Sequence, residues 1–511
     1  MLQIPPPPPS QFDGRNVGGL TRRMRRAGRS SPRYRFVIAA LAAFAVVMSA
    51  MAANRPLPEY LKSAVVYQVV LRNITAEGTF SAAEKKLEHI RDAGMDVVYL
   101  TPFVEMDRDA DISGWSRRQK ESGCNSPLNP YRIKNYDKID AEYGGDSDFD
   151  SFCAKAHALG MKVFLDLVYC HCGPNNVIKD IVPDAIQRDA NGNLRKNNYN
   201  FLLLDFASKD VRKYLIDSML NWIRRGCDGF RCDIGYRVPL EFWEEASRKC
   251  REVKPDLVLI NEGYPTEYLK TAFDSCYNFP WSFTIRRMIV PGTPGGKSPK
   301  KGTFADKMAI IRKYEATAPE NSLFLCFMDN HDTAMSDKER RFDRLKPVEA
   351  GNAGFVLTFL RRGLPLVFNG NEIADNALSS IFMPDDRRLP RKTVNWGRAA
   401  TPEGQKRLAL IRSLAKLRHE MPVFAEGTQE WVTDGEGQGA VAFLRRIGDT
   451  AVFVAANLTD KPVCFKPSCG FRAAADGAAL LSEDGALSED GECRLGPWGY
   501  VVQPLCHRQL P

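Results

Sequence analysis

Four acidic side chains stand at or near the ends of short apolar runs: Asp166, Asp233, Glu262 and Asp332. If those runs are parallel strands, the four side chains project from one rim of the sheet. A single aspartate after a strand is usually a loop or helix-cap residue. Burying several carboxylates together is costly, so four of them at successive strand ends indicate a catalytic site rather than packing.

Cleavage of a glycosidic bond is the chemistry that needs such a cluster. One carboxylate attacks the anomeric carbon while a carboxylic acid protonates the leaving oxygen. The nucleophile must stay ionised, which Arg231 would favour because it lies two residues before Asp233 on the same strand face. The acid must keep its proton at the working pH, which crowded carboxyls and a less polar wall favour.

The elements that must position these groups are short strands separated by amphipathic helices or long loops. Strand candidates lie at 65–70, 96–102, 162–168, 228–233, 257–262, near 277, 323–328 and 365–369. This alternation predicts a parallel α/β architecture, for which a closed (β/α)8 TIM-type barrel is the economical solution. A doubly wound sheet is the alternative, but no glycine-rich phosphate loop follows the first strand.

The pattern changes beyond about residue 420, where short alternating runs such as 440–444, 450–455 and 497–502 are separated by turn signals. These runs predict a C-terminal antiparallel β domain. We therefore expect a leader at 1–53, a catalytic barrel at 54–420 with long loops after its second and third strands, and a β-sandwich-like domain at 421–511.

The leader carries most of the charge. Residues 1–53 hold eight Arg and one Asp, so they contribute +7 of the formal +9 and leave a nearly neutral body. A nucleic-acid partner is therefore not expected. The disordered basic stretch and the charge-free apolar run at 36–52 predict a secretory signal peptide cleaved near 52/53. We expect a secreted or periplasmic protein that leaves the membrane after cleavage; an uncleaved anchor is the alternative.

The thirteen cysteines leave their pairing open. Export would permit disulfides among Cys464, Cys469, Cys493 and Cys506, but buried free thiols are equally consistent with the sequence. The Cys170-His171-Cys172 segment does not predict zinc, because neighbouring residues of an extended chain point to opposite faces.

Several ordered segments carry a family resemblance. They are Asp166-Leu-Val-Tyr-Cys-His171, Gly229-Phe-Arg-Cys-Asp233, Glu262, Phe327-Met-Asp-Asn-His-Asp332 and Gly363-Leu-Pro-Leu-Val-Phe-Asn-Gly-Asn-Glu372. Together they resemble the conserved segments of the α-amylase family (glycoside hydrolase family 13) over roughly residues 60–500. Any one segment is short enough to arise by chance, whereas all of them in order make a specific signal.

The resemblance implies a role for each matched residue. Asp233 is the expected nucleophile, Glu262 the general acid/base and Asp332 the third catalytic carboxylate. The residues expected to bind substrate are Tyr67, which would stack on the sugar, together with Tyr136, Asp166, His171, Arg231 and His331. The Asn129-Pro-Tyr131 and Asn135-Tyr136-Asp137 segments resemble a substrate-side segment of the family. Trp115, Trp281 and Trp396 are further candidates for sugar stacking.

The sequence departs from the family pattern at three places. Cys170 replaces an asparagine that commonly binds calcium in the family, and calcium prefers oxygen ligands, so we expect no cofactor and no metal there. Arg237 stands where many members have His or Lys beyond the nucleophile. The insertion at about 169–207 is short, so we expect either a more open cleft or a cleft shaped by the loop at 103–145.

Three functions are compatible with these residues. The first is a retaining glycoside hydrolase that cleaves α-glucosidic bonds in starch, glycogen or maltooligosaccharides through a covalent glycosyl-enzyme. The second keeps the site but changes the acceptor, as in a transglycosylase, an isomerase or a sucrose-acting relative. The third is a non-catalytic glucan-binding protein, which all three intact carboxylates disfavour. The expected partner is an α-glucan or oligosaccharide; the sequence leaves the oligomeric state open.

Overall fold

The structure is a computed structural model that describes residues 55–122, 124, 126–290, 302–334, 341–377, 380–382, 393–468, 471–473 and 478–507. The expected leader at 1–53 and Cys469 lie outside the described residues. None of the helices formed by the described residues is long and apolar enough to cross a membrane.

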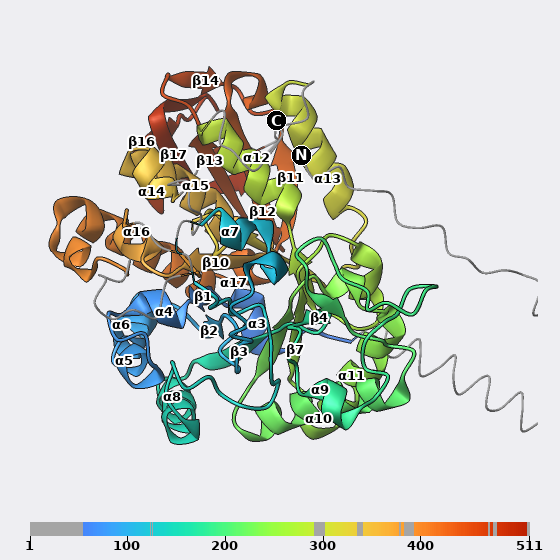
Figure 1. Ribbon diagram of the computed structural model, residues 1–511. Helices are drawn as coiled ribbons and strands as arrows, with labels where there is room; N and C mark the ends of the chain where they lie inside the picture. The colour runs from blue at the N-terminus through green and yellow to red at the C-terminus, as the bar shows by residue number, and fades with distance from the viewer. Residues whose placement is uncertain are drawn as a thin grey trace, which may run out of the picture.

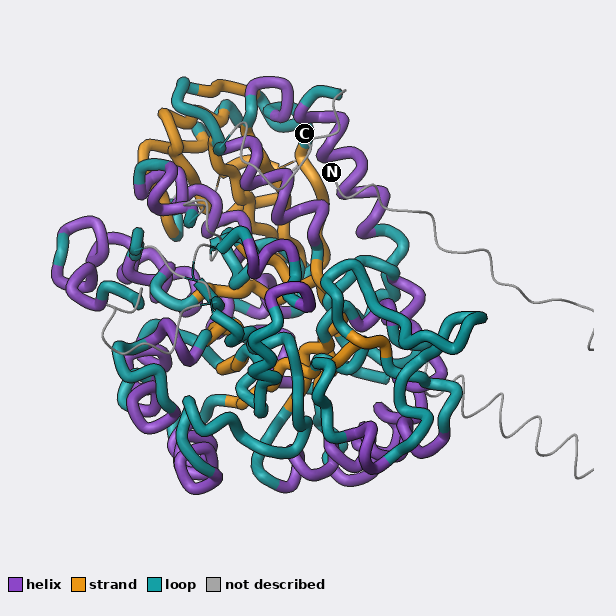
Figure 2. The backbone as a smooth tube through the Cα atoms, in the orientation of Figure 1, coloured by secondary structure: helices purple, strands orange, loops and turns teal. Residues whose placement is uncertain are grey.

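Eight parallel strands close into a barrel, in the order β1-β10-β9-β8-β7-β6-β3-β2 (Figures 1 and 2). The strands are β1 (Val66–Val69), β2 (Val97–Leu100), β3 (Lys162–Leu167), β6 (Gly229–Cys232), β7 (Val258–Asn261), β8 (Ser275–Tyr277), β9 (Leu323–Phe327) and β10 (Leu364–Phe368). This closed order confirms the predicted barrel and excludes the doubly wound alternative.

Helices surround the barrel and follow the predicted pattern (Figure 1). They include α3 (Glu59–Ser63), α5 (Phe80–Glu84), α6 (Leu87–Asp92), α8 (Asp146–Ala158), α10 (Lys209–Arg224), α11 (Leu240–Val253), α12 (Phe279–Ile289), α13 (Phe304–Glu315), α15 (Val348–Leu360) and α16 (Pro402–Glu420). The Ser208 hydroxyl accepts the Val211 N–H at 3.4 Å and so caps α10. Gly160, with φ of +76°, ends the α8 turn in the left-handed conformation that glycine adopts most easily.

Side chains alternate between the inside and the outside of the barrel. On β1, Val66 packs in the interior, and Gln68 shares its face, whereas Val65, Tyr67 and Val69 pack against the surrounding helices. The interior cluster also contains Val97, Tyr99, Phe164, Val258, Ile260, Tyr277, Leu325, Phe327 and Leu366. This two-residue period decides which strand residues can reach the mouth of the barrel.

Two long loops rise from the strand ends that carry the predicted site. The loop after β2 contains η1 (Ile112–Gly114) and α7 (Arg117–Lys120), and the loop after β3 contains β4 (His171–Cys172), α9 (Ile178–Ile181) and β5 (Leu202–Leu203). The Asn200 side-chain amide donates to the Trp115 carbonyl at 3.2 Å. The loops after these two neighbouring strands therefore contact each other.

The C-terminal part is a seven-stranded antiparallel sheet, at the top of Figure 1. Its strands are β11 (Thr428–Val432), β12 (Ala440–Ile447), β13 (Thr450–Asn457), β14 (Val463–Phe465), β15 (Phe471–Ala473), β16 (Leu481–Leu487) and β17 (Cys493–His507). The long β17 pairs with β13, β14, β15 and β16. One face, with Phe443 and Val454, joins the barrel core, and the other, with Leu444 and Phe453, forms its own core.

The cysteines of this sheet are free thiols in the part of the chain that the structure describes. Cys464 and Cys506 are exposed and Cys493 is buried. Of these three described cysteines, only Cys493 matches the alternative of a buried free thiol.

Candidate active site

The predicted carboxylates gather around the guanidinium of Arg231. Asp166 and Arg231 lie directly opposite each other on β3 and β6, and their side chains approach to 2.6 Å. The Arg231 Nη1 atom lies 3.1 Å from Asp233 Oδ1, and its Nη2 atom lies 2.9 Å from Glu262 Oε1. A guanidinium is planar and rigid, so it holds these three carboxylates on one wall of the mouth.

Asp166 supports this cluster from below. Its carboxylate accepts hydrogen bonds from Tyr99 at 2.7 Å and from Tyr131 at 3.0 Å, in addition to Arg231. Asp166 and Arg231 are both buried, and the bonds among them occupy the polar atoms of the carboxylate. In the structure this pair supports the reacting groups, and its direct contact with substrate stays a prediction.

Asp233 and Glu262 are almost fully buried, each 8% exposed. Burial and the negative charge of Glu262 raise the pKa of Asp233 well above its usual range, against the opposing effect of Arg231. Burial also raises the pKa of Glu262, although Arg231 and the backbone N–H of Ile234, 2.8 Å away, oppose it. Two interacting carboxyls titrate as a pair. The pair therefore keeps a shared proton at a pH where isolated carboxyls have lost theirs.

The turn after Asp233 positions the backbone N–H of Ile234 that contacts Glu262. Ile234 adopts a left-handed backbone conformation, φ +38°, which is unusual for a β-branched residue and marks a position held by its surroundings. This conformation directs its N–H to Glu262. Gly235 follows, and a Cβ atom there would lie 2.7 Å from Asn261 Oδ1.

Asp332 follows β9 and is the most exposed of the carboxylates, with 38% of its side chain accessible. Its Oδ1 atom forms an ion pair with Nη1 of Arg118, which belongs to α7 in the loop after β2. Burial raises the pKa of Asp332, but the surrounding groups, with the Arg118 and Arg231 guanidinium cations among them, outweigh that effect, so its pKa lies below the usual range. Asp332 is therefore ionised.

His331 connects the interior of β1 to the same cluster. The backbone N–H of His331 donates to Gln68 Oε1 at 3.0 Å, which turns the Gln68 amide nitrogen toward His331 Nδ1 at 2.9 Å. Burial lowers the pKa of His331 to about 4, so the ring is neutral and carries its proton on Nε2. Nε2 lies 2.7 Å from the Tyr131 hydroxyl, which in turn donates to Asp166.

His171 lies against the loop after β3. Its Nε2 atom is 3.2 Å from the Tyr131 carbonyl, and its ring stacks on Phe201 with centroids 4.7 Å apart. Burial lowers its pKa to about 4. The buried Nδ1 atom has no hydrogen-bond partner among the described residues, and it is an acceptor when Nε2 donates to the carbonyl.

Tyr67 does not reach the site, contrary to our expectation. Its ring lies on the outer face of β1, where the hydroxyl donates to Glu372 at 3.0 Å and accepts the Gly370 N–H at 3.1 Å. The error has a simple cause: adjacent strand residues face opposite sides, and Gln68 is the one that faces inward. The aromatic ring that stacks on His331 is that of Tyr131, at 5.3 Å.

Tyr136 forms hydrogen bonds that connect the loops next to the site. Its hydroxyl donates to the His171 carbonyl at 3.0 Å, and its own carbonyl accepts the Trp222 indole N–H at 3.0 Å. The ring is buried and packs edge-on against Tyr169. Tyr136 therefore joins the loops after β2 and β3 and lies behind the residues that face the mouth.

Two of the three candidate tryptophans are part of the core. Trp115 is buried, and its indole N–H donates to the Asp109 carbonyl at 3.0 Å. Trp281 is fully buried between the barrel and the C-terminal sheet, 5.9 Å from Trp431, with the Arg361 guanidinium 4.1 Å from its ring centre. Neither side chain is available to stack on a sugar.

Trp396 is half-buried on a different part of the rim. Its indole N–H donates to the Ile74 carbonyl at 2.7 Å, and the Lys86 ammonium lies 4.4 Å from the centre of the ring. It borders a cavity of about 870 Å³ whose other lining residues include Thr75, Glu77, Lys85, Arg344 and Asn395. None of the carboxylates described above lines this cavity.

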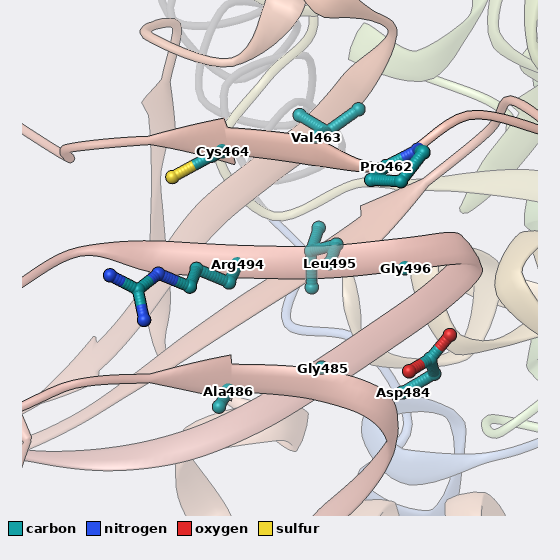
Figure 3. Close-up of a pocket in the computed structure, with 9 residues that line it drawn as sticks. All are labelled: Pro462, Val463, Cys464, Asp484, Gly485, Ala486, Arg494, Leu495 and Gly496. Atoms are coloured by element: carbon teal, nitrogen blue, oxygen red, sulfur yellow. The ribbon is translucent and has the colours of Figure 1, made fainter.

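A second cavity, of about 480 Å³, lies in the C-terminal sheet between β14, β16 and β17 (Figure 3). Figure 3 shows Cys464 and Arg494 at one end and Asp484 and Gly496 at the other, with Leu495 and Gly485 between them. It has no aromatic lining residue and does not include the carboxylate cluster.

The sequence did not single out four residues that the structure brings to the mouth. Gln68 and Tyr99 reach it from the interior face of the barrel, and Arg118 reaches it from the loop after β2. Tyr199, which is 44% exposed, stacks on Phe201 at 6.3 Å above His171. Strand alternation could have found Gln68, but no local pattern marks Arg118 or Tyr199.

Cys170, which replaces an asparagine that binds calcium in the family, is not suited to bind calcium. The thiol is buried, and burial raises its pKa to about 12, so it is neutral. Calcium requires oxygen ligands. Among the described residues, no group of three His, Cys, Asp or Glu side chains is arranged to hold a metal ion.

Comparison with known proteins finds similar chains in one family. The family model described as the alpha amylase catalytic domain matches residues 72–189 and 193–407. Alpha-amylase MalA of Haloarcula japonica is 24% identical over 487 residues, covering 90% of this chain and 65% of its own. The intracellular maltogenic amylase of Bacillus subtilis is 23% identical over 393 residues, covering 73% and 60%. This chain thus spans somewhat less than two thirds of the length of these relatives.

Solved structures share the fold. An alpha-amylase from Lactobacillus plantarum superposes with a TM-score of 0.69 and 24% identity, covering 88% of this chain and 100% of its own. The maltogenic alpha-amylase AmyB of Thermotoga neapolitana gives 0.70 and 23%, covering 87% and 99%. Because the catalytic-domain model matches more than half of the chain, in the region that contains all three catalytic candidates, this protein belongs to the alpha-amylase family.

Proposed function

We propose that this protein is a retaining glycoside hydrolase that cleaves α-glucosidic bonds in α-glucans such as starch, glycogen or maltooligosaccharides. The observation that carries the proposal is the sharing of Arg231 by Asp233 and Glu262, at 3.1 Å and 2.9 Å. Retaining enzymes need two carboxyls close enough to act on the same glycosidic bond from different directions, with one proton between them. Because the pKa values of Asp233 and Glu262 are raised, the pair can keep that proton.

In the first step, a carboxylate oxygen of Asp233 attacks the anomeric carbon as the bond from that carbon to the leaving oxygen breaks. Glu262 gives its proton to the leaving oxygen, so the first sugar product departs neutral. The buried Arg231 stays charged and favours the ionised form of Asp233. In the second step, Glu262 takes a proton from water, whose oxygen attacks the same carbon and releases Asp233. Both carboxyls return to their starting state.

The surrounding groups suit a cationic transition state. Asp332 is ionised and partly exposed at the mouth, so it can accept hydrogen bonds from sugar hydroxyls and stabilise the positive charge that develops on the ring. The Nδ1 atom of neutral His171, which has no hydrogen-bond partner among the described residues, is an additional acceptor. Both histidines remain uncharged at neutral pH, so they do not oppose the cation.

The test uses the purified full chain with amylose, maltotriose, pullulan and sucrose, followed by product analysis and anomer-resolving NMR. We expect reducing sugar from an α-glucan, released first as the α-anomer. Asp233→Asn should abolish release from every substrate. Glu262→Gln should abolish release from amylose but keep measurable activity on α-maltosyl fluoride, whose leaving group needs no proton.

Glu252→Gln is the matched control, because it removes an exposed carboxylate on α11 that pairs only with Arg248 in the ion pairs described. It should leave activity unchanged. A β-anomer as first product, or full activity in Asp233→Asn, would contradict the proposed mechanism.

Sugar transfer is the second candidate activity, and a specific feature favours it. Tyr236 and Tyr264, with ring centres 6.3 Å apart, lie beside Glu262, and Arg237 lies over Tyr236 at 5.5 Å. A Cβ atom on the intervening Gly263 would touch the Tyr236 ring. Half-exposed aromatic rings next to the proton donor suit a sugar acceptor in place of water.

Two similar proteins carry names of that kind: an alpha-1,4-glucan:maltose-1-phosphate maltosyltransferase of Salinibacter ruber, 25% identical over 269 residues, and a trehalulose synthase mutant with a TM-score of 0.69. Product analysis with and without added maltose separates transfer from hydrolysis. Longer oligosaccharides that form only with the acceptor would identify a transglycosylase.

We also propose that the protein acts outside the cytoplasm. The proposal is supported by the basic stretch and the charge-free apolar run of residues 1–53. Expression of the full chain and N-terminal sequencing of the product test it. Export predicts a product outside the cytoplasm that begins near residue 53, and an intact leader retained with the cells would contradict it.

A further inference from the structure

The loop after β2 brings a cationic side chain to a carboxylate that follows a non-adjacent strand. Arg118 belongs to α7, in the loop after β2, yet its ion-pair partner Asp332 follows β9. In the closed barrel, β1 and β10 lie between β2 and β9. The Arg118–Asp332 pair therefore spans the ends of two intervening strands on the side of the barrel where the carboxylates lie.

The base of Arg118 is firmly anchored. The Ser116 hydroxyl accepts the Gln119 N–H at 3.1 Å and caps α7. The buried Gln119 side chain donates to the Ser126 carbonyl at 2.9 Å and accepts from the Asn129 amide at 3.3 Å. These bonds fix one side of the helical turn in the loop and leave Arg118, 30% exposed, to point toward the mouth.

A second bridge extends the same wall. The Asn200 amide, in the loop after β3, donates to the Trp115 carbonyl, one residue before the cap of α7. Tyr199 precedes it and stacks on Phe201, which stacks on His171. The loops after β3 and β2 and the residue after β9 are thus linked in a continuous arc over part of the rim.

Groups of both signs face Asp332 beneath this arc. They are the cations Arg118 and Arg231, the carboxyls Asp233 and Glu262, the neutral His331, and the hydroxyls of Tyr131 and Tyr199. Arg118 is the cation that makes a direct ion pair with Asp332. A guanidinium presents its N–H donors in a fixed planar fork, so its ion pair with Asp332 sets the direction in which that carboxylate points.

We propose that Arg118 is a positioning and specificity-determining residue, which orients Asp332 toward the sugar in the pocket and closes one end of the cleft, so that short α-glucan oligosaccharides are preferred over long polymers. A polymer needs open space on both sides of the bond that is cut. In this proposal the arc limits the chain on one side of that bond, whereas a short chain needs only the other side. This inference rests on the proposed hydrolysis of α-glucans.

The test compares Arg118→Gln and Arg118→Lys with the unaltered full chain on maltotriose and on amylose, with kcat and KM measured separately. In Arg118→Gln we expect kcat on maltotriose to fall about tenfold, as for loss of one charge-assisted hydrogen bond. The ratio of kcat/KM for amylose to that for maltotriose should rise by about the same factor. Arg118→Lys keeps the charge but not the fork, so it should give intermediate values.

Arg117→Gln is the matched control: it lies next to Arg118 on α7 but is 87% exposed and pairs with Glu121. It should behave as the unaltered chain, and all variants should keep its melting temperature. Equal loss on both glucans, an unchanged substrate ratio in Arg118→Gln, or no rescue by Arg118→Lys would overturn the inference. Failure of the unaltered chain to cleave either glucan would instead refute the proposed function.

Discussion

The substitution Gln68→Glu tests the hydrogen-bond chain that connects the barrel interior to the carboxylates. In the unaltered chain, Gln68 donates to His331 Nδ1, His331 Nε2–H donates to Tyr131, and Tyr131 donates to Asp166. A glutamate cannot donate at this position when ionised, so His331 must carry a proton on Nδ1. A neutral His331 ring then accepts from Tyr131, and the Tyr131 proton is drawn away from Asp166.

The magnitude follows from the bond that is lost. The Tyr131–Asp166 hydrogen bond has an ionised acceptor, and such bonds contribute about 1.5–3 kcal/mol. At about 1.4 kcal/mol for each factor of ten, kcat should fall by roughly 10- to 100-fold. The new carboxylate should also raise the pKa of His331 above its present value of about 4, because an opposite charge at contact distance favours the imidazolium.

The assay is ¹⁵N NMR of histidine-labelled protein, with the His331 signals assigned by their loss in His331→Gln. The unaltered chain should show a neutral His331 with its proton on Nε2 across pH 5 to 8, and Gln68→Glu should move the proton to Nδ1 or give the imidazolium. Gln438→Glu, an exposed change in the 3-10 turn between β11 and β12, serves as the control. A His331 protonated on Nδ1 in the unaltered chain would refute this order of donors.

Three other predictions address stability and substrate binding. Asp233→Asn should raise the melting temperature at pH 7 but not at pH 3. Because the pKa of Asp233 is raised in the folded state, the free energy of unfolding falls by about 1.4 kcal/mol for each pH unit between the unfolded-state and folded-state pKa values. The amide of asparagine does not ionise, so the variant does not lose this stability. An equal melting temperature at pH 7 would contradict the raised pKa. Trp281→Ala should destabilise the chain by about 3–5 kcal/mol in denaturant titrations while kcat of the folded fraction is kept, because the ring is fully buried away from the carboxylates; a selective loss of kcat would count against its structural role. Tyr199→Ala should raise KM for maltotriose several-fold with little change in kcat, whereas an unchanged KM would show that the exposed ring does not contact the sugar.

Much of the fold could be predicted from the sequence because local patterns determine it. β-branched runs, helix caps such as Ser208 and helix-ending glycines such as Gly160 act within a few residues, and the eight strands follow from them. The grouping of Asp166, Asp233, Glu262 and Asp332 also followed, since the ends of parallel strands in a closed barrel share one rim. The family resemblance gave the same carboxylates their expected roles.

The errors arose where the answer depended on which way a side chain points. Tyr67 and Gln68 are adjacent, and only the packing of β1 against β2 and β10 decides which of them faces the interior. Trp281 is an aromatic residue of the kind that can stack on a sugar, but the C-terminal sheet covers it. The covering residue Trp431 comes from 150 residues further along the chain.

The sequence by itself determined the order of the strands along the chain, the carboxylates at their ends and the catalytic chemistry that those groups favour. Tertiary structure alone decided that Arg231 joins Asp166, Asp233 and Glu262, that Asp332 meets Arg118, and that burial raises the pKa values of the reacting pair. The physical reason is that ion pairing and desolvation depend on distance and burial in space, and residues such as 118 and 332 have no local signal that links them.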